Sequence, residues 1–126
     1  MVKNLQVYKC DVCGNIVEIL NVGGGQLVCC GKPMTLLEEN TVDAAVEKHI
    51  PVAEVKDGEV HVKVGEVEHP MLAEHFIQWV EVITKDGQVL RQNLNADEKP
   101  VAVFKVDSEI DRVREYCNLH GLWSNK

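Results

Sequence analysis

Apolar and polar residues alternate along several short runs in the second half of the chain, and this period of two predicts β-strands rather than helices. In the clearest run, Val60, Val62 and Val64 alternate with polar residues. The Asp-Gly pair within residues 85–88 predicts a tight turn between two such strands. Residues 108–117 have a weak helical periodicity instead, and we expect a helical turn there. The predicted strands occupy residues 60–64, 75–84, 89–94 and 101–106.

The first part of the chain has a different pattern, with cysteines and glycines in place of a long apolar alternation. Residues 15–21 predict a strand, the glycines at 23–25 predict a turn, and residues 26–29 predict the returning strand. This hairpin is too small for a hydrophobic core of its own, because chains below about 40 residues usually need a metal or a similar cross-link. Residues 37–46 are polar and lack a strand pattern, so we predict a linker there.

The pattern therefore predicts an all-β protein with two domains. A small metal-stapled hairpin domain occupies residues 1–36, and the linker covers residues 37–46. Residues 47–126 form an immunoglobulin-like antiparallel β-sandwich, because short strands separated by turns favour this architecture. Hydrophobic residues make up 45% of the chain and aromatic residues only 5%, so valine, isoleucine and leucine must fill most of the core.

Charge and hydropathy limit the partners of the chain. The net charge of −7 argues against nucleic acid, which is bound by clustered lysine and arginine. An anionic substrate would need a local positive field at its site. We expect no membrane association, because no apolar run reaches the roughly 18 residues of a membrane span. The first residues lack the pattern of a secretory signal, so we expect a cytoplasmic protein, whose reduced cysteines favour metal binding over disulfides.

Four of the five cysteines lie within the first thirty residues, with the spacing C-x2-C-x15-C-C. Four thiolates on a hairpin suit a tetrahedral zinc or iron site, and the spacing does not decide between these metals. Neighbouring side chains of an extended strand point to opposite faces, so the adjacent cysteines need a local twist to share one metal. The alternative is a pair of buried thiols or a vicinal disulfide. The four cysteines are Cys10, Cys13, Cys29 and Cys30.

The fifth cysteine, Cys117, lies three residues before His120. By itself it is open to four interpretations: a core thiol, a nucleophile, a disulfide partner or a metal ligand. His61 lies in the middle of a strand on a face expected to be solvated, and we predict that it is not a ligand. The other histidines lie at the ends of elements or in loops, where binding groups concentrate. These are His49, His69, His75 and His120.

Four imidazoles and one thiolate would suit a five-coordinate transition metal with one vacant position, and iron is the natural candidate for redox chemistry. Six segments carrying these residues closely resemble the desulfoferrodoxin family, the two-iron type of superoxide reductase. The resemblance covers essentially the whole chain, in order. The segments are YKCDVCGNIVE, LVCCGKPM, EKHIPV, HPM, EHFIQWVE and REYCNLHGLW.

The resemblance implies two mononuclear iron ions. A desulforedoxin- or rubredoxin-like domain holds the first with Cys10, Cys13, Cys29 and Cys30. The second has Cys117 as its axial ligand and an open sixth position that makes it square-pyramidal. Its four equatorial ligands are His49, His69, His75 and His120.

Glu47 and Lys48 match a mobile pair beside the open position of the second iron. The resemblance implies that Lys48 attracts superoxide and orients a water that delivers a proton, and that Glu47 ligates the oxidised iron after product release. The alternative for both residues is an ordinary solvated charge pair.

The implied activity is one-electron reduction of superoxide to hydrogen peroxide, with electrons from an external donor such as rubredoxin, in a cytoplasmic homodimer. We also expect a calcium ion at a surface or interface site. Three competing hypotheses are a non-enzymatic electron carrier, a zinc-binding structural module and a superoxide dismutase. Four aromatic residues are expected to line the core or the sites rather than to relay electrons: Tyr8, Trp79, Tyr116 and Trp123.

Overall fold

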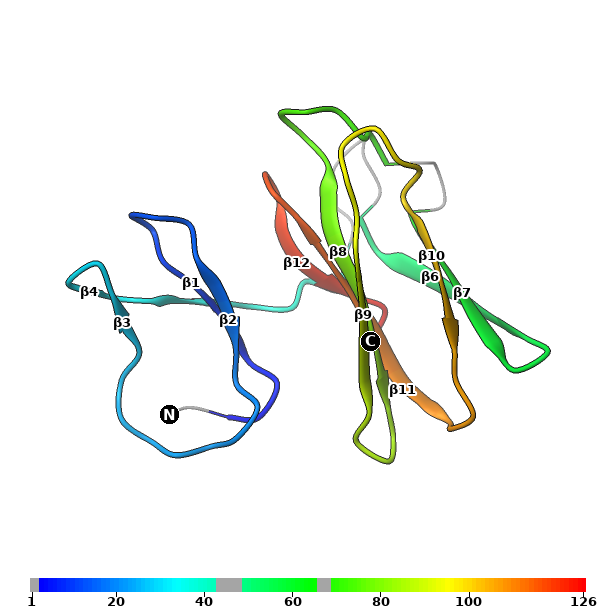
Figure 1. Ribbon diagram of the computed structural model, residues 1–126, viewed down its shortest axis with the longest axis horizontal. Coiled ribbons are helices and arrows are strands. Elements are labelled where there is room, and N and C mark those ends of the chain that lie inside the picture. Colours follow the sequence, from blue (N-terminus) through cyan, green and yellow to red (C-terminus); the bar gives the residue numbers. More distant parts are fainter. Residues whose placement is uncertain (1–2, 43–48, 66–68) are drawn as a thin grey trace. The chain divides into compact units, whose positions relative to one another are not determined.

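The computed structural model describes residues 3–42, 49–65 and 69–126, and these contain twelve β-strands and no helix. The chain forms two compact units, Met1–Glu38 and Glu39–Lys126 (Figure 1). The boundary falls inside residues 37–46, the predicted linker. Within the described ranges, no helix offers the length and apolar character needed to cross a membrane.

The first unit contains a three-stranded antiparallel sheet, in which β1 (Val7–Lys9) lies between β2 (Ile16–Glu18) and β5 (Thr35–Leu37). Two further short strands, β3 (Val28–Cys29) and β4 (Lys32–Pro33), pair with each other. The unit has little apolar core. Its buried apolar side chains are Val7, Cys10 and Ile19.

The predicted pairing of residues 15–21 with residues 26–29 is wrong. β2 pairs with β1, and β3 pairs with β4. Closing the tight turn between β3 and β4 orders fewer residues than closing the glycine-rich loop after β2, so the shorter closure costs less chain entropy.

The second unit is a sandwich of two antiparallel sheets, which confirms the predicted architecture (Figure 1). The smaller sheet has the strand order β10-β7-β6 and the larger sheet has the order β12-β11-β8-β9. The strands of the smaller sheet are β6 (Pro51–Lys56), β7 (Glu59–Val64) and β10 (Val101–Lys105). Those of the larger sheet are β8 (Ile77–Thr84), β9 (Val89–Asn93), β11 (Ile110–Cys117) and β12 (Gly121–Ser124).

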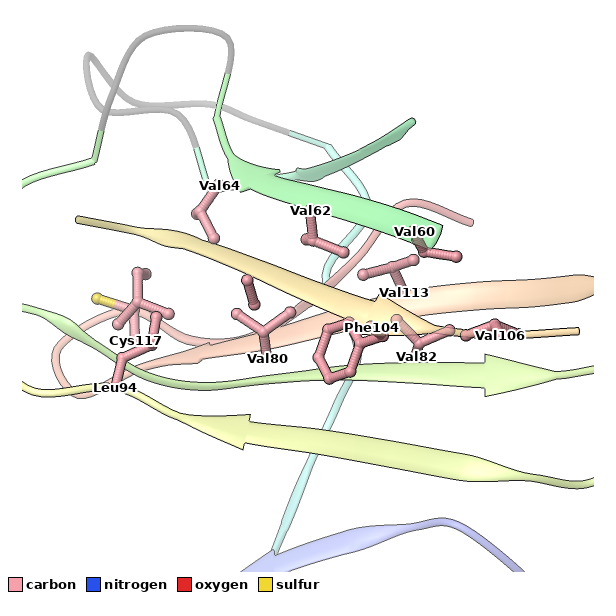
Figure 2. Packing of buried hydrophobic residues seen from close by; sticks show 12 residues of the cluster. Val60, Val62, Val64, Val80, Val82, Leu94, Phe104, Val106, Val113 and Cys117 are labelled. Carbon is pink, nitrogen blue, oxygen red and sulfur yellow. The ribbon is translucent and has the colours of Figure 1, made fainter. Parts of the chain in front are cut away.

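The core between the two sheets is built mainly from valine, as the low aromatic content predicted. Val60, Val62 and Val64 alternate inward from β7 and meet Val80 and Val82 of β8 (Figure 2). Cys117 lies at one end of this cluster, far from Val106 at the other end (Figure 2). The core therefore carries one thiol to the end of the sandwich.

The helical turn expected at residues 108–117 is wrong, because this segment forms most of β11. Both faces of the second half of β11 are buried, so its apolar residues do not show a period of two. Val113 and Cys117 face the core, while Arg114 lies on the opposite face, where it is also fully buried. A strand buried on both faces gives no alternation for sequence reasoning to detect.

The outer face of the larger sheet contains a buried ion pair between neighbouring strands. Arg114 of β11 is directly opposite Glu81 of β8, and their side chains are 0% and 1% exposed. Arg114 donates from Nε to Glu81 Oε1 over 3.0 Å. Glu39 adds a second carboxylate 3.5 Å from Arg114 Nη1 and also accepts from Arg112 Nε over 2.8 Å. The start of the second unit is thereby tied to β11.

Replacing Arg114 with methionine should destabilise the second unit by about 3–5 kcal/mol, because it leaves the Glu81 carboxylate buried without its cation. Urea unfolding of Arg114→Met measures this loss. The double variant Arg114→Met/Glu81→Leu should recover much of it. The control Lys63→Met, at an exposed position of β7, should stay within about 0.5 kcal/mol of wild type. An equal effect of Lys63→Met and Arg114→Met would contradict the assignment.

Candidate metal centres

The first candidate centre begins at the end of β1. Cys10 N–H donates to the Asn15 carbonyl over 2.9 Å, and Gly14 N–H donates to the Cys10 carbonyl over 3.0 Å. Gly14 has a φ of 82°, which closes this turn at no Cβ cost. Cys13 N–H then points at Cys10 Sγ over 3.4 Å. The C-x2-C spacing therefore brings both sulfurs to one side of the turn.

The adjacent cysteines reach the same centre through a left-handed turn. Cys30 has a φ of 54° and Gly31 a φ of 73°, directly after β3 ends at Cys29. Cys29 Sγ lies 3.6 Å from Cys13 Sγ and 4.0 Å from Cys30 Sγ. This geometry confirms the predicted local twist. All five cysteines of the chain are free, so the alternative of a vicinal disulfide is wrong for this structure.

The four sulfurs of the first centre lie within 4.8 Å of one another, as a group that could hold a metal ion. Hydrogen bonds from the backbone N–H groups of Cys13 and Val12 lower the pKa of Cys10 to about 6. Hydrogen bonds with the Cys10 and Cys13 sulfurs raise the pKa of Cys29 to about 12. Ionisation of Cys10 is thus favoured, whereas ionisation of Cys29 beside it is disfavoured. A divalent cation removes this conflict, because it deprotonates the thiols that coordinate it.

The second candidate centre lies at the end of the sandwich where Cys117 ends the core. His49 lies two residues before the start of β6, and His69 and His75 lie in the segment before β8. Cys117 is the last residue of β11, and His120 lies in the turn to β12. One ligand atom from each of the five residues lies within 4.8 Å of all the others.

The turn between β11 and β12 explains the spacing of Cys117 and His120. Cys117 pairs with Gly121, so only three residues separate the two strands. Gly121 has a φ of 89°, as expected where a three-residue hairpin loop returns to its partner strand. The turn brings His120 Nδ1 to 3.8 Å from Cys117 Sγ.

The four imidazoles form a closed ring. Successive ring centroids are 4.7, 4.8, 4.9 and 4.7 Å apart in the order His69–His49, His69–His75, His75–His120 and His120–His49, and every pair is edge-to-face. His49 Nε2 lies 3.0 Å from His120 Nδ1. Nitrogens that converge from four edge-to-face rings, with a thiol nearby, match the donor set of a transition metal such as iron.

Contacts outside the ring orient its members. His69 Nδ1 lies 2.7 Å from the Pro70 carbonyl and donates to it, which leaves Nε2 with a lone pair for a metal. Trp123 stacks on His49 at a centroid distance of 4.8 Å and donates from Nε1 to the His120 carbonyl over 3.0 Å. Trp123 therefore lines the centre. Trp79 and Tyr116 stack on each other at 5.9 Å instead.

The members of the second centre differ in their exposure to solvent. His49, His69 and Cys117 are at most 2% exposed and His75 is 9% exposed, whereas His120 is exposed. Among the described residues, His120 is therefore the solvent-exposed member of the second centre.

Three other predicted positions have different outcomes. His61 lies on the exposed face of β7, 3.3 Å from Glu59, and is outside the five-residue group. Glu47 and Lys48 lie outside the described residues. Their predicted place beside the centre stays a prediction.

Two contacts that shape the second centre were not predicted from the sequence. The Pro70 carbonyl fixes the tautomer of His69, and the His-Pro dipeptide itself was the available signal. Asn118 bonds the segment on both sides of His75. Its signal was a turn-forming residue directly after Cys117.

Comparison with known proteins gives consistent matches over the whole chain. The family model described as Desulfoferrodoxin matches residues 41–126, and that described as Desulfoferrodoxin, N-terminal domain, matches residues 2–37. A desulfoferrodoxin of Syntrophotalea carbinolica is 58% identical over 126 residues, which are 100% of this chain and 99% of the relative. A desulfoferrodoxin homolog of Archaeoglobus fulgidus is 53% identical and covers 99% of both chains. The crystal structure of the superoxide reductase from Treponema pallidum has a TM-score of 0.84 at 35% identity and covers 98% of both chains.

The two groups predict separable metal sites. Anaerobically reconstituted protein should bind two iron ions per chain, one for each group. Cys13→Ser should lose the ion of the first group and keep that of the second, and Cys117→Ser should do the reverse. Iron analysis with the visible thiolate-to-iron absorption measures both, and zinc in either place would be colourless. Loss of both ions in either single variant would contradict independent sites.

Proposed function

The chain belongs to the desulfoferrodoxin family and is an oxidoreductase, and on that premise we propose that it is a superoxide reductase. The reaction adds one electron and two protons to superoxide and gives hydrogen peroxide. The observation that carries the proposal is the closed ring of four imidazoles beside the Cys117 thiol.

We propose that both groups hold iron. An iron ion at the second group would supply the electron and a positive charge for the anionic substrate. Cys117, at the end of the core, would donate electron density to the metal through its buried sulfur. Its 0% exposure keeps water away from that sulfur. The first group, Cys10, Cys13, Cys29 and Cys30, would hold the other ion and cross-link a unit that has little core.

The proposal includes a local positive field, because a protein of net charge −7 repels superoxide at long range. Lys48 precedes the candidate ligand His49 in the sequence and would provide this charge near the metal. It would also orient the water that delivers a proton, since proton transfer needs a positioned group. Glu47 would occupy the metal after the product leaves.

Several finer expectations belong to the same proposal. The domain limits 1–36, 37–46 and 47–126, the homodimer, the rubredoxin donor, the cytoplasmic location and the calcium ion all stay predictions. The first iron has two candidate roles, electron relay and structural cross-link, and the small core of the first unit favours the second.

Product stoichiometry tests the proposed reaction. Pulsed superoxide should yield one hydrogen peroxide for each superoxide, release no oxygen and consume an added one-electron donor. A dismutase would instead release one oxygen for every two superoxides without a donor, and a simple electron carrier would not consume superoxide catalytically. Quantifying peroxide, oxygen and donor in one experiment distinguishes these activities. Oxygen at half the superoxide consumed would overturn the proposal.

Replacing Lys48 with alanine should slow the second-order reaction with superoxide by about tenfold at low salt, because the local attraction is lost. The difference should shrink as the ionic strength rises, since salt screens the charge. Pulse radiolysis of the iron-loaded protein measures the rate. Lys63→Ala, on the exposed face of β7, is the matched control and should change the rate by less than about twofold. Equal rates for Lys48→Ala and wild type would remove Lys48 from the mechanism.

A further inference from the structure

Asn118 makes three hydrogen bonds with the segment that carries His75. Its Oδ1 accepts from Phe76 N–H over 2.9 Å, and its Nδ2 donates to the Glu74 carbonyl over 3.0 Å. Its own N–H donates to the Phe76 carbonyl over 3.2 Å. The side chain of Asn118 thus bonds both residues that flank His75.

The backbone of His75 itself is held from the other side. Leu72 N–H donates to the His75 carbonyl over 2.9 Å, and His75 N–H donates to the Leu72 carbonyl over 3.0 Å. The peptide groups from the Glu74 carbonyl to the Phe76 carbonyl are therefore all bonded either to Leu72 or to Asn118. Such a completely bonded segment has little freedom to shift.

Asn118 acts where the regular strand pairing fails. The register of β11 against β8 shifts between Tyr116 and Cys117, so that Tyr116 is paired with Trp79 and Cys117 with Ile77. Irregularities of this kind re-aim side chains at the ends of strands. Cys117 and Ile77 form the last pair, and beyond them the ladder no longer holds the two strands together. The bonds of Asn118 continue the connection between them.

We propose that Asn118 is a positioning residue that fixes His75 relative to Cys117 and so sets the metal affinity of the second centre. The inference rests on the proposed function only in taking the five-residue group as the iron site. Asn118 follows Cys117 directly and precedes His120 by two residues. One short turn therefore carries two candidate ligands and also bonds the segment that contains His75. His75 completes the ring, with its centroid 4.8 Å from that of His69 and 4.9 Å from that of His120. A shift of the segment 74–76 would open the ring on both sides of His75.

Asn125, directly after the end of β12, offers a matched control. Asn125 Oδ1 accepts from Val113 N–H over 2.9 Å, and Asn125 N–H donates to the Val113 carbonyl over 3.1 Å. This reproduces the paired bonds of Asn118 with Phe76, but on a residue that lies outside the five-residue group. Asn125→Ala therefore removes a bond of the same kind without touching a candidate ligand.

Anaerobic competition of the full chain with an Fe(II) chelator tests the proposal. Asn118→Ala should weaken Fe(II) binding at the second centre by about 10- to 100-fold, the range found when a group that orients a metal ligand is removed. The four-cysteine site of the first unit should keep its iron affinity and its thiolate-to-iron absorption, and it serves as an internal reference. The ferric absorption of the weakened site should also shift. Asn125→Ala should leave both affinities within about twofold of wild type. Equal affinities in Asn118→Ala and Asn125→Ala would overturn the proposal.

A double-variant cycle decides whether Asn118 acts through His75. In a His75→Ala background, adding Asn118→Ala should change the Fe(II) affinity by less than about twofold, because the ligand that Asn118 positions is already absent. A full second loss in that background would overturn the positioning role. If Asn118→Ala does not fold, Asn118→Asp replaces it, since the carboxylate keeps an acceptor for Phe76 N–H and loses the donor to Glu74. Its affinity should then fall below wild type, and an unchanged affinity would overturn the proposal.

These readouts are independent of superoxide turnover. Lowered affinity in Asn118→Ala, together with a wild-type protein that fails the stoichiometry test, would overturn the proposed function and keep the positioning role. Correct stoichiometry of the wild-type protein, together with an unchanged iron affinity in Asn118→Ala, would keep the proposed function and overturn the positioning role.

Discussion

The pairing of β8 with β11 is the interaction on which the second unit depends. One face of the pair carries valines into the core, and the other face carries the buried Arg114–Glu81 ion pair. The end of the pair delivers Cys117 to the end of the sandwich. Because both faces are buried, the pair is held by apolar burial on one side and by a desolvated ion pair on the other. Loops attached to so firmly held a pair can present histidines in fixed positions, which a metal centre requires.

The first unit differs from the second, because few buried side chains stabilise it. Turns take the place of a core there, and the left-handed conformations of Cys30 and Gly31 turn adjacent side chains toward one centre. Crowding four sulfurs within 4.8 Å is unfavourable without a cation, because one thiolate opposes the next. Metal binding to the four sulfurs would therefore be coupled to the folding of the first unit. In the second unit, the sandwich itself holds the candidate ligands in place, so its folding would not depend on a metal in the same way.

Sequence reasoning succeeded where local pattern and chemistry coincide. The alternation around Val62 predicted β7, and the Asp-Gly pair predicted the turn between β8 and β9. It failed for β11, because a strand buried on both faces has no period of two, and for the pairing of β2, because loop closure selected a nearer partner for β3. The sequence predicted the four histidines of the ring as a set of candidate ligands. The edge-to-face order of the ring and the bonds of Asn118 could not be predicted, since they depend on a register shift between strands far apart in the sequence.

The sequence by itself determined the donor atoms available to this protein. Four cysteines at C-x2-C-x15-C-C spacing, and a fifth beside His120, limit the chain to metals that accept sulfur and nitrogen donors, because residue type alone sets the donor element. Only the tertiary structure decided which of these atoms meet. Cys117 and His75 come together because β11 lies beside β8, and Asn118 can bond to the segment around His75 only where the regular ladder ends. Local sequence sets turns and periodicity, whereas the convergence of distant segments depends on strand pairing and on burial of the whole sandwich.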